Sequence, residues 1–110
     1  MKVTLHHGLS KSEWFEKTIF EQMANVGSEV FRAIKWQKKN AEYSRLAFER
    51  GVELLNLTIE DDKNENRQRE LFCLRELFTD YLSGNNSYHS TADFFEKYFY
   101  AFNYAARINT

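Results

Sequence analysis

Apolar side chains recur along this chain at steps of three and four residues, and the chain contains no proline to interrupt them. One such series begins at Phe15 and continues through Ile19, Met23, Val26, Val30 and Ile34. Steps of three and four place side chains on one face of an α-helix. Similar series follow in three later stretches, and no stretch shows the sustained alternation of a β-strand. The pattern predicts an all-α fold.

Local signals indicate where the first two helices begin and end. Ser10 and Glu13 have the spacing of a capping box, so we expect the first helix to begin there and to continue toward Lys39. Gly27, inside this helix, indicates a close approach by another helix, a bend, or a break into two shorter helices. Asn40 is expected to cap the second helix, which ends near Ile59.

The second half of the chain divides at two polar segments, residues 60–66 and 85–90, which we expect to be loops. Asn64 or Asn66 is expected to cap the third helix, and Gly84 to follow its end in a left-handed conformation. Ser90 and Asp93 then resemble the start of the first helix, and predict a fourth.

Four helices joined by short loops favour antiparallel neighbours. We therefore predict an up-down-up-down four-helix bundle that forms a single domain over residues 10–110, preceded by a flexible tail at residues 1–9. A chain of 110 residues is long enough to bury one core of its own.

Charge and composition narrow the classes of partner. The net charge of −1 gives no general attraction to nucleic acid or to anionic lipid. No apolar run is long enough to cross a membrane or to form a signal peptide, so we expect a cytoplasmic protein. The single Cys73 lies between Phe72 and Leu74 and is expected to be a buried thiol.

The sequence contains no motif for a cofactor, a metal ion or catalysis. His6 and His7 lie in the tail and His89 in a loop, without the helical spacing that metal ligands require. The glycines are isolated, so no phosphate-binding loop is present, and Cys73 has no histidine nearby. We expect a protein that is not an enzyme and needs no cofactor.

Charged residues lie on or beside the apolar faces of the helices. A charge near a core must be paired, so we expect a buried ion-pair network made of Glu29, Arg50, Glu53 and Arg75. The alternative is an anion-binding pocket lined by Arg50 and Arg75.

A basic stripe is interleaved with Trp36 and Tyr43. Its candidate anion-binding or nucleic-acid-binding residues are Arg32, Lys35, Lys39 and Arg45. Cations beside aromatic rings bind single-stranded nucleic acid by phosphate contact and stacking. The alternative, which the balanced charge of the chain favours, is a solvated helix end that complements the helix dipole.

The last predicted helix is unusually aromatic, with seven rings between residues 94 and 104. We expect a core stripe of Phe95, Tyr98, Phe102 and Ala105. Three of the other rings, on Phe94, Tyr100 and Tyr104, are expected to form an exposed interface with a second copy of the chain or with another protein.

Two local resemblances and one of architecture accompany these patterns. Residues 40–54 resemble the helix junction and second helix of a tetratricopeptide repeat, without a second copy. Residues 23–30 and 98–107 resemble a group of small prokaryotic all-helical proteins to which no activity is assigned. The architecture is similar to that of HEPN-type bundles, which partner nucleotidyltransferases or act as ribonucleases.

The catalytic HEPN-type proteins carry an arginine four to six residues before a histidine, and no arginine precedes a histidine at that spacing here. The sequence therefore predicts a small helical interaction module that contacts a partner through its aromatic last helix. The alternative is a nucleic-acid-associated protein, or the HEPN-like partner of a nucleotidyltransferase, without the ribonuclease motif.

Overall fold

The computed structural model describes residues 10–108, and over this range the chain is helical and contains no strand. The prediction of an all-α fold is confirmed. The helices are α1 (Lys11–Glu16), α2 (Ile19–Trp36), α3 (Ala41–Glu60), a 3₁₀ helix η2 (Asp62–Arg67), α4 (Gln68–Ser83) and α5 (Ala92–Ile108). The described chain thus has five α-helices where we predicted four.

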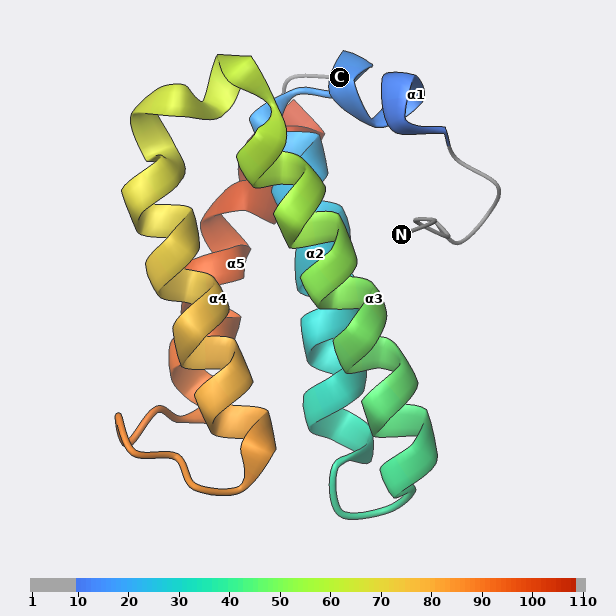
Figure 1. Cartoon of the computed structure of the whole chain (residues 1–110), viewed down its shortest axis with the longest axis vertical. Helices are drawn as coiled ribbons and strands as arrows, with labels where there is room; N and C mark the ends of the chain where they lie inside the picture. The colour runs from blue at the N-terminus through green and yellow to red at the C-terminus, as the bar shows by residue number, and fades with distance from the viewer. Residues whose placement is uncertain (1–9, 109–110) are drawn as a thin grey trace.

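The four longer helices run alternately up and down the molecule, as Figure 1 shows. Helices α2 and α3 lie side by side, and α2 also packs against α5, so α2 is the central element. The η2 segment crosses from the end of α3 to the start of α4. The predicted tail, with His6 and His7, lies outside the described residues.

The first predicted helix is divided, but at Lys17 rather than at Gly27. Ser10 and Glu13 form the expected capping box, and Thr18 and Glu21 form a second one at the start of α2. Because Lys17 between them has an extended backbone, the single helix expected from Ser10 is wrong. The turn lets Trp14, which is fully buried, donate from Nε1 to the Thr58 hydroxyl at 3.2 Å.

Gly27 lies within the uninterrupted helix α2, at a close approach to α5. A Cβ atom added at Gly27 would lie 2.8 Å from Cδ1 of Phe99. Of the three alternatives for this glycine, the close approach of another helix is therefore the correct one.

The segment expected to be a loop at residues 60–66 is largely ordered as η2, and part of it is buried. Asn64 is 3% exposed and donates to the Gln22 side chain and to the Thr58 carbonyl, each at 2.9 Å. Gln22 in turn donates to the Asp61 carboxylate at 2.9 Å. Polar side chains pack here because each finds a hydrogen-bond partner.

The ends of the other helices are partly as predicted. Asn40 caps α3 and Gly84 is left-handed, with φ of 94°. Helix α4 begins after Arg67 without a side-chain cap, so the caps expected at Asn64 or Asn66 are wrong. The hydroxyl that accepts from a backbone N–H at the start of α5 belongs to Thr91, not to Ser90.

The core contains aromatic residues from several helices. Phe95 and Phe102 are buried as predicted, and Tyr98 and Ala105 are partly buried, but Phe99, absent from the predicted stripe, is fully buried.

Cys73 is exposed, so the prediction of a buried thiol is wrong. It lies between the buried positions of α4 at Leu71 and Leu74, on the outer side of the helix. No helix among residues 10–108 has both the length and the apolar character to cross a membrane.

Candidate functional site

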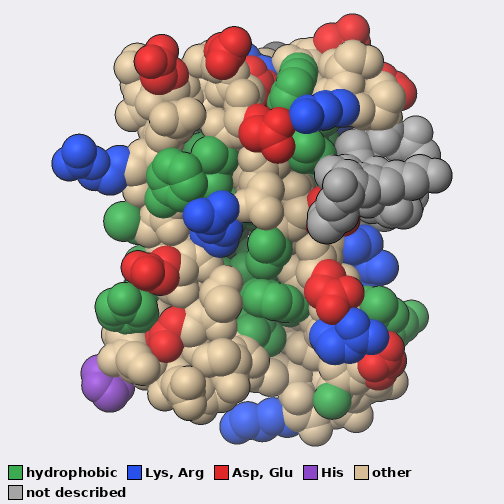
Figure 2. All heavy atoms as spheres, in the orientation of Figure 1, with side chains coloured by type: hydrophobic (Ala, Val, Ile, Leu, Met, Phe, Trp, Pro, Cys, Tyr) green, Lys and Arg blue, Asp and Glu red, His purple; other side chains and the backbone are tan. Residues whose placement is uncertain are grey.

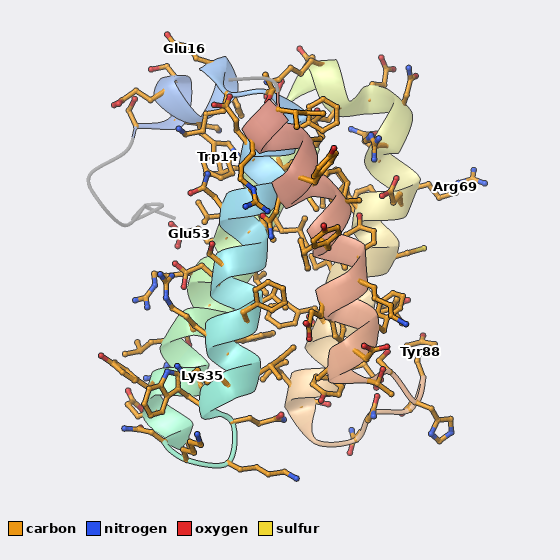
Figure 3. The ribbon with its side chains drawn as sticks, turned by 180° about the vertical axis from the view of Figure 1, so that it is seen from behind. Trp14, Glu16, Lys35, Glu53, Arg69 and Tyr88 are labelled. Atoms are coloured by element: carbon orange, nitrogen blue, oxygen red, sulfur yellow. The ribbon has the colours of Figure 1, made fainter. Side chains whose placement is uncertain are left out.

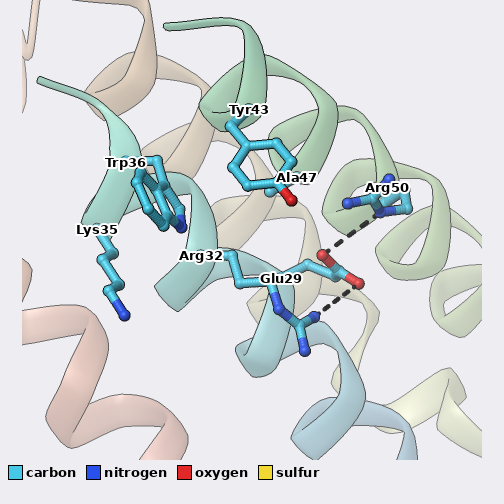
Figure 4. A pocket seen from close by; sticks show the side chains of 7 residues that line it. All are labelled: Glu29, Arg32, Lys35, Trp36, Tyr43, Ala47 and Arg50. Carbon is cyan, nitrogen blue, oxygen red and sulfur yellow. Dashed lines mark hydrogen bonds and ion pairs between the residues drawn. The ribbon is translucent and has the colours of Figure 1, made fainter. Parts of the chain in front are cut away.

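A hollow of about 520 Å³ opens between α2 and α3 near the turn that joins them. Its volume is in the range of small-molecule binding sites. We call this hollow the α2–α3 cleft; its lining residues, drawn in Figure 4, are Glu29, Arg32, Lys35, Trp36, Tyr43, Ala47 and Arg50.

At one end of the cleft a buried carboxylate holds two guanidinium groups. Glu29 is 2% exposed, and its Oε2 accepts a hydrogen bond from Nη1 of Arg32 at 3.1 Å. Nε of Arg50 lies 3.6 Å from its Oε1, an ion pair longer than a hydrogen bond. Helix α2 supplies Glu29 and Arg32, three residues apart, and α3 supplies Arg50. The pairing offsets the cost of burying the Glu29 carboxylate.

At the other end of the cleft two rings meet edge to face. The centroids of Trp36 and Tyr43 are 5.4 Å apart, with an interplanar angle of 68°. Tyr43 is 54% exposed, so much of its ring is accessible. The Lys35 ammonium lies 5.7 Å from the centroid of the Trp36 ring, and in Figure 4 Lys35 lies on the Trp36 side of the cleft, apart from Glu29.

A small residue, Ala47, lines the cleft between its two ends. Ala47 is one turn after Tyr43 and nearly one turn before Arg50, so these three residues lie on one face of α3. Ala47 is 2% exposed.

The structure does not gather the predicted basic stripe into one surface. Arg32 and Lys35 line the α2–α3 cleft, whereas Arg45 lines a separate hollow beside α4. There Arg45 is paired with Glu42 and Glu49, and these carboxylates raise its pKa. Lys39 is exposed and lines neither hollow. On the face shown in Figure 2, acidic and basic side chains are interspersed rather than separated by sign.

The predicted ion-pair network is also divided. Glu29 and Arg50 meet, but Arg75 lies elsewhere, with Nη1 2.7 Å from the Asn56 side-chain oxygen and its guanidinium over Phe72. The anion pocket expected from Arg50 together with Arg75 is therefore not formed. The pocket that does form combines Arg50 with Arg32, and the sequence contained the signal for it: Glu29 and Arg32 are one helical turn apart.

Glu53 does not join the network either. Its Oε1 is buried and has no hydrogen-bond partner among the described residues, and burial raises the pKa of its carboxyl group. Figure 3 shows Glu53 on α3, between the levels of Trp14 and Lys35 along the molecule.

The rings predicted to form an interface are exposed, but they form two groups. Tyr100 and Tyr104 are 61% and 53% exposed and stack on each other, with centroids 6.5 Å apart. Phe94 is 41% exposed and instead stacks on Tyr98. Ile108, 62% exposed, lies one turn beyond Tyr104. We call Tyr100, Tyr104 and Ile108 the outer face of α5.

Two further features concern metal binding and a partly buried tyrosine. Residues 10–108 contain no group of histidine, cysteine and carboxylate side chains suited to hold a metal ion. The Tyr98 hydroxyl lies 2.6 Å from the Glu70 carboxylate, and burial together with this partner raises the pKa of Tyr98.

Comparisons of the chain with protein-family models, with curated proteins and with solved structures give no match.

Proposed function

We propose that this protein is a small helical interaction module that self-associates through the outer face of α5. In this proposal the four longer helices form the antiparallel bundle that holds α5 rigid. The observation that carries the proposal is the stacked pair of Tyr100 and Tyr104, which is more than half exposed although large rings are usually buried.

The size of this face suits a weak association. Each large ring has roughly 150–250 Å² to bury, so the two tyrosines and Ile108 together expose a patch of a few hundred Å². Patches of that size on a monomer are often functional. Two such patches bury less than a stable interface of about 1,600 Å², so we expect a dimer that depends on concentration.

The order of charges along α5 favours an antiparallel pair of these helices. The first turn carries Asp93 and the last turn carries Arg107. Around a two-fold axis near Tyr100, the middle residue of α5, the first turn of one helix faces the last turn of the other. Asp93, which also pairs with Lys97 of its own helix at 3.1 Å, then faces Arg107 of the second copy at both ends of the contact, while the two Tyr100 rings meet at its centre.

Sedimentation velocity over a concentration series tests the proposal. We expect the wild-type chain to shift from monomer toward dimer at about 100 µM, because an interface smaller than the standard size gives a weak association. The double variant Tyr100→Ser and Tyr104→Ser should remain monomeric. Tyr88→Ser is the matched control, because Tyr88 is 56% exposed but lies in the loop before α5. A wild-type chain that stays monomeric, or a dimer that both variants leave intact, contradicts the proposal.

A further inference from the structure

We propose that the α2–α3 cleft binds a nucleotide, with the phosphate between Arg32 and Arg50 and the base against Tyr43. This inference is independent of the self-association proposed for α5. It depends on the two chemically different ends of the cleft, one made of guanidinium groups and the other of rings.

The guanidinium end retains donors for an anion. Arg32 uses one N–H group on Glu29, and Arg50 approaches Glu29 through Nε at 3.6 Å. Among residues 10–108 the other N–H groups of these two arginines have no protein acceptor, and a guanidinium group has five in all. Glu29 positions both arginines, because it holds each one by a different carboxylate oxygen. Arginine donors in this forked arrangement match the oxygens of a phosphate.

The charge of the cleft favours a phosphate monoester over a carboxylate. Three cations, Arg32, Lys35 and Arg50, line it, against the single carboxylate of Glu29. The lining therefore has a formal excess of two positive charges. A phosphate monoester near neutral pH carries close to two negative charges, whereas a carboxylate carries one.

The ring end provides a surface for a base. The half-exposed Tyr43 ring and the Trp36 ring meet at 68° and form a corner. Stacking of a base on an aromatic side chain contributes affinity with any base, because every base has a π face.

The distance between the two ends selects the shape of the ligand. Arg50 follows Tyr43 by seven positions on α3, which corresponds to about 10 Å along the helix axis. Ala47 lines the cleft between them. A ligand that contacts both ends needs a ring and an anionic group joined by a spacer, and in a nucleotide the ribose is that spacer.

Isothermal titration calorimetry with four probes tests the inference. Adenosine 5′-monophosphate should bind at least about tenfold more tightly than adenosine or inorganic phosphate, because each of these engages only one end of the cleft. A six-residue adenosine oligonucleotide distinguishes the source of the ligand. Tighter binding of the monophosphate assigns the cleft to a free nucleotide, as its charge favours. Tighter binding of the oligonucleotide, whose internal phosphates are diesters with one charge each, would refute the preference for a monoester and assign the cleft to a nucleotide within a strand.

Variants assign the binding to the cleft. Arg32→Gln and Tyr43→Ser should each weaken binding of the monophosphate by about tenfold, the loss expected for one charge-assisted contact or one stacked ring. Arg45→Gln is the matched control, since Arg45 is also exposed and paired with carboxylates but lies beside the other hollow. Circular dichroism confirms that each variant is folded. No binding of any probe by the folded wild-type chain, or an equal loss in the Arg45 variant, overturns the inference.

Discussion

The two glycines inside the long helices provide a matched test of how tightly these helices pack. Gly27 in α2 and Gly51 in α3 are both buried, and both have a helical backbone conformation, which alanine also adopts. On helix propensity alone, either substitution by alanine stabilises the protein by about 1 kcal/mol. We expect Gly51→Ala to approach this gain and Gly27→Ala to destabilise the protein.

The difference comes from the neighbours of the added methyl group. At Gly27 it would lie 2.8, 2.9 and 3.1 Å from Cδ1, Cγ and Cβ of Phe99, well inside the optimal carbon separation of about 3.5–4.0 Å. Cβ of Phe99 cannot move by a change of rotamer, so α5 itself must shift. At Gly51 the nearest atoms, Cβ of Glu29 and Cε2 of Phe78, are at 3.4 Å, close to an ordinary contact.

These contacts set the expected magnitudes. Overpacking of a core costs about 1–3 kcal/mol, and because a backbone-linked atom is involved we place Gly27→Ala in the upper half of that range. When the gain of about 1 kcal/mol in helix propensity is subtracted, Gly27→Ala should lower the free energy of unfolding by about 1–2 kcal/mol. Gly51→Ala should be between neutral and about 1 kcal/mol more stable than the wild type.

Urea denaturation followed by helical circular dichroism measures both free energies of unfolding. The double variant Gly27→Ala and Phe99→Ala provides the control, because alanine at residue 99 removes the two nearest contacts, Cδ1 and Cγ. The free-energy loss caused by Gly27→Ala should therefore be smaller in the Phe99→Ala background than in the wild type. If Gly27→Ala were as stable as Gly51→Ala, the close packing of α2 on α5 would be refuted.

Three further predictions concern the polar groups. Asn64→Ala removes the donor to Gln22 and to the Thr58 carbonyl, and should lower the free energy of unfolding in urea by about 2–3 kcal/mol. Asn66 is exposed, so Asn66→Ala should lower it by less than about 0.5 kcal/mol. Similar losses in both variants would contradict the buried network. Burial raises the pKa of Glu53 above that of the unfolded chain, so its ionisation opposes folding as the pH rises through the folded pKa. Glu53→Gln should therefore raise the melting temperature at pH 7, with the gain lost below about pH 4, and a gain independent of pH would show that ionisation is not the cause. Thr18→Ala should cost about 1 kcal/mol by the loss of the cap on α2, and no change in the urea midpoint would argue against the capping box seen here.

Local signals in the sequence predicted the helical class, the caps at Ser10 and Asn40 and the left-handed Gly84. Each of these depends on a few neighbouring residues, because a cap is a hydrogen bond across three positions. The division of the first helix was also local: Thr18 and Glu21 repeat the spacing of Ser10 and Glu13. The continuous apolar series across them obscured this second start.

Tertiary structure alone decided which polar side chains are buried and which cations meet. Asn64 belongs to the interior because Gln22, 42 residues away, accepts its hydrogen bond. Arg32 and Arg50 meet around Glu29, whereas Arg45 and Arg75 find other partners. The amphipathic helices follow from the order of the residues along the chain, since periodicity and capping act over a few positions. The rotation of each helix about its axis, and with it the α2–α3 cleft and the exposed rings of α5, was decided by the packing of all the helices together.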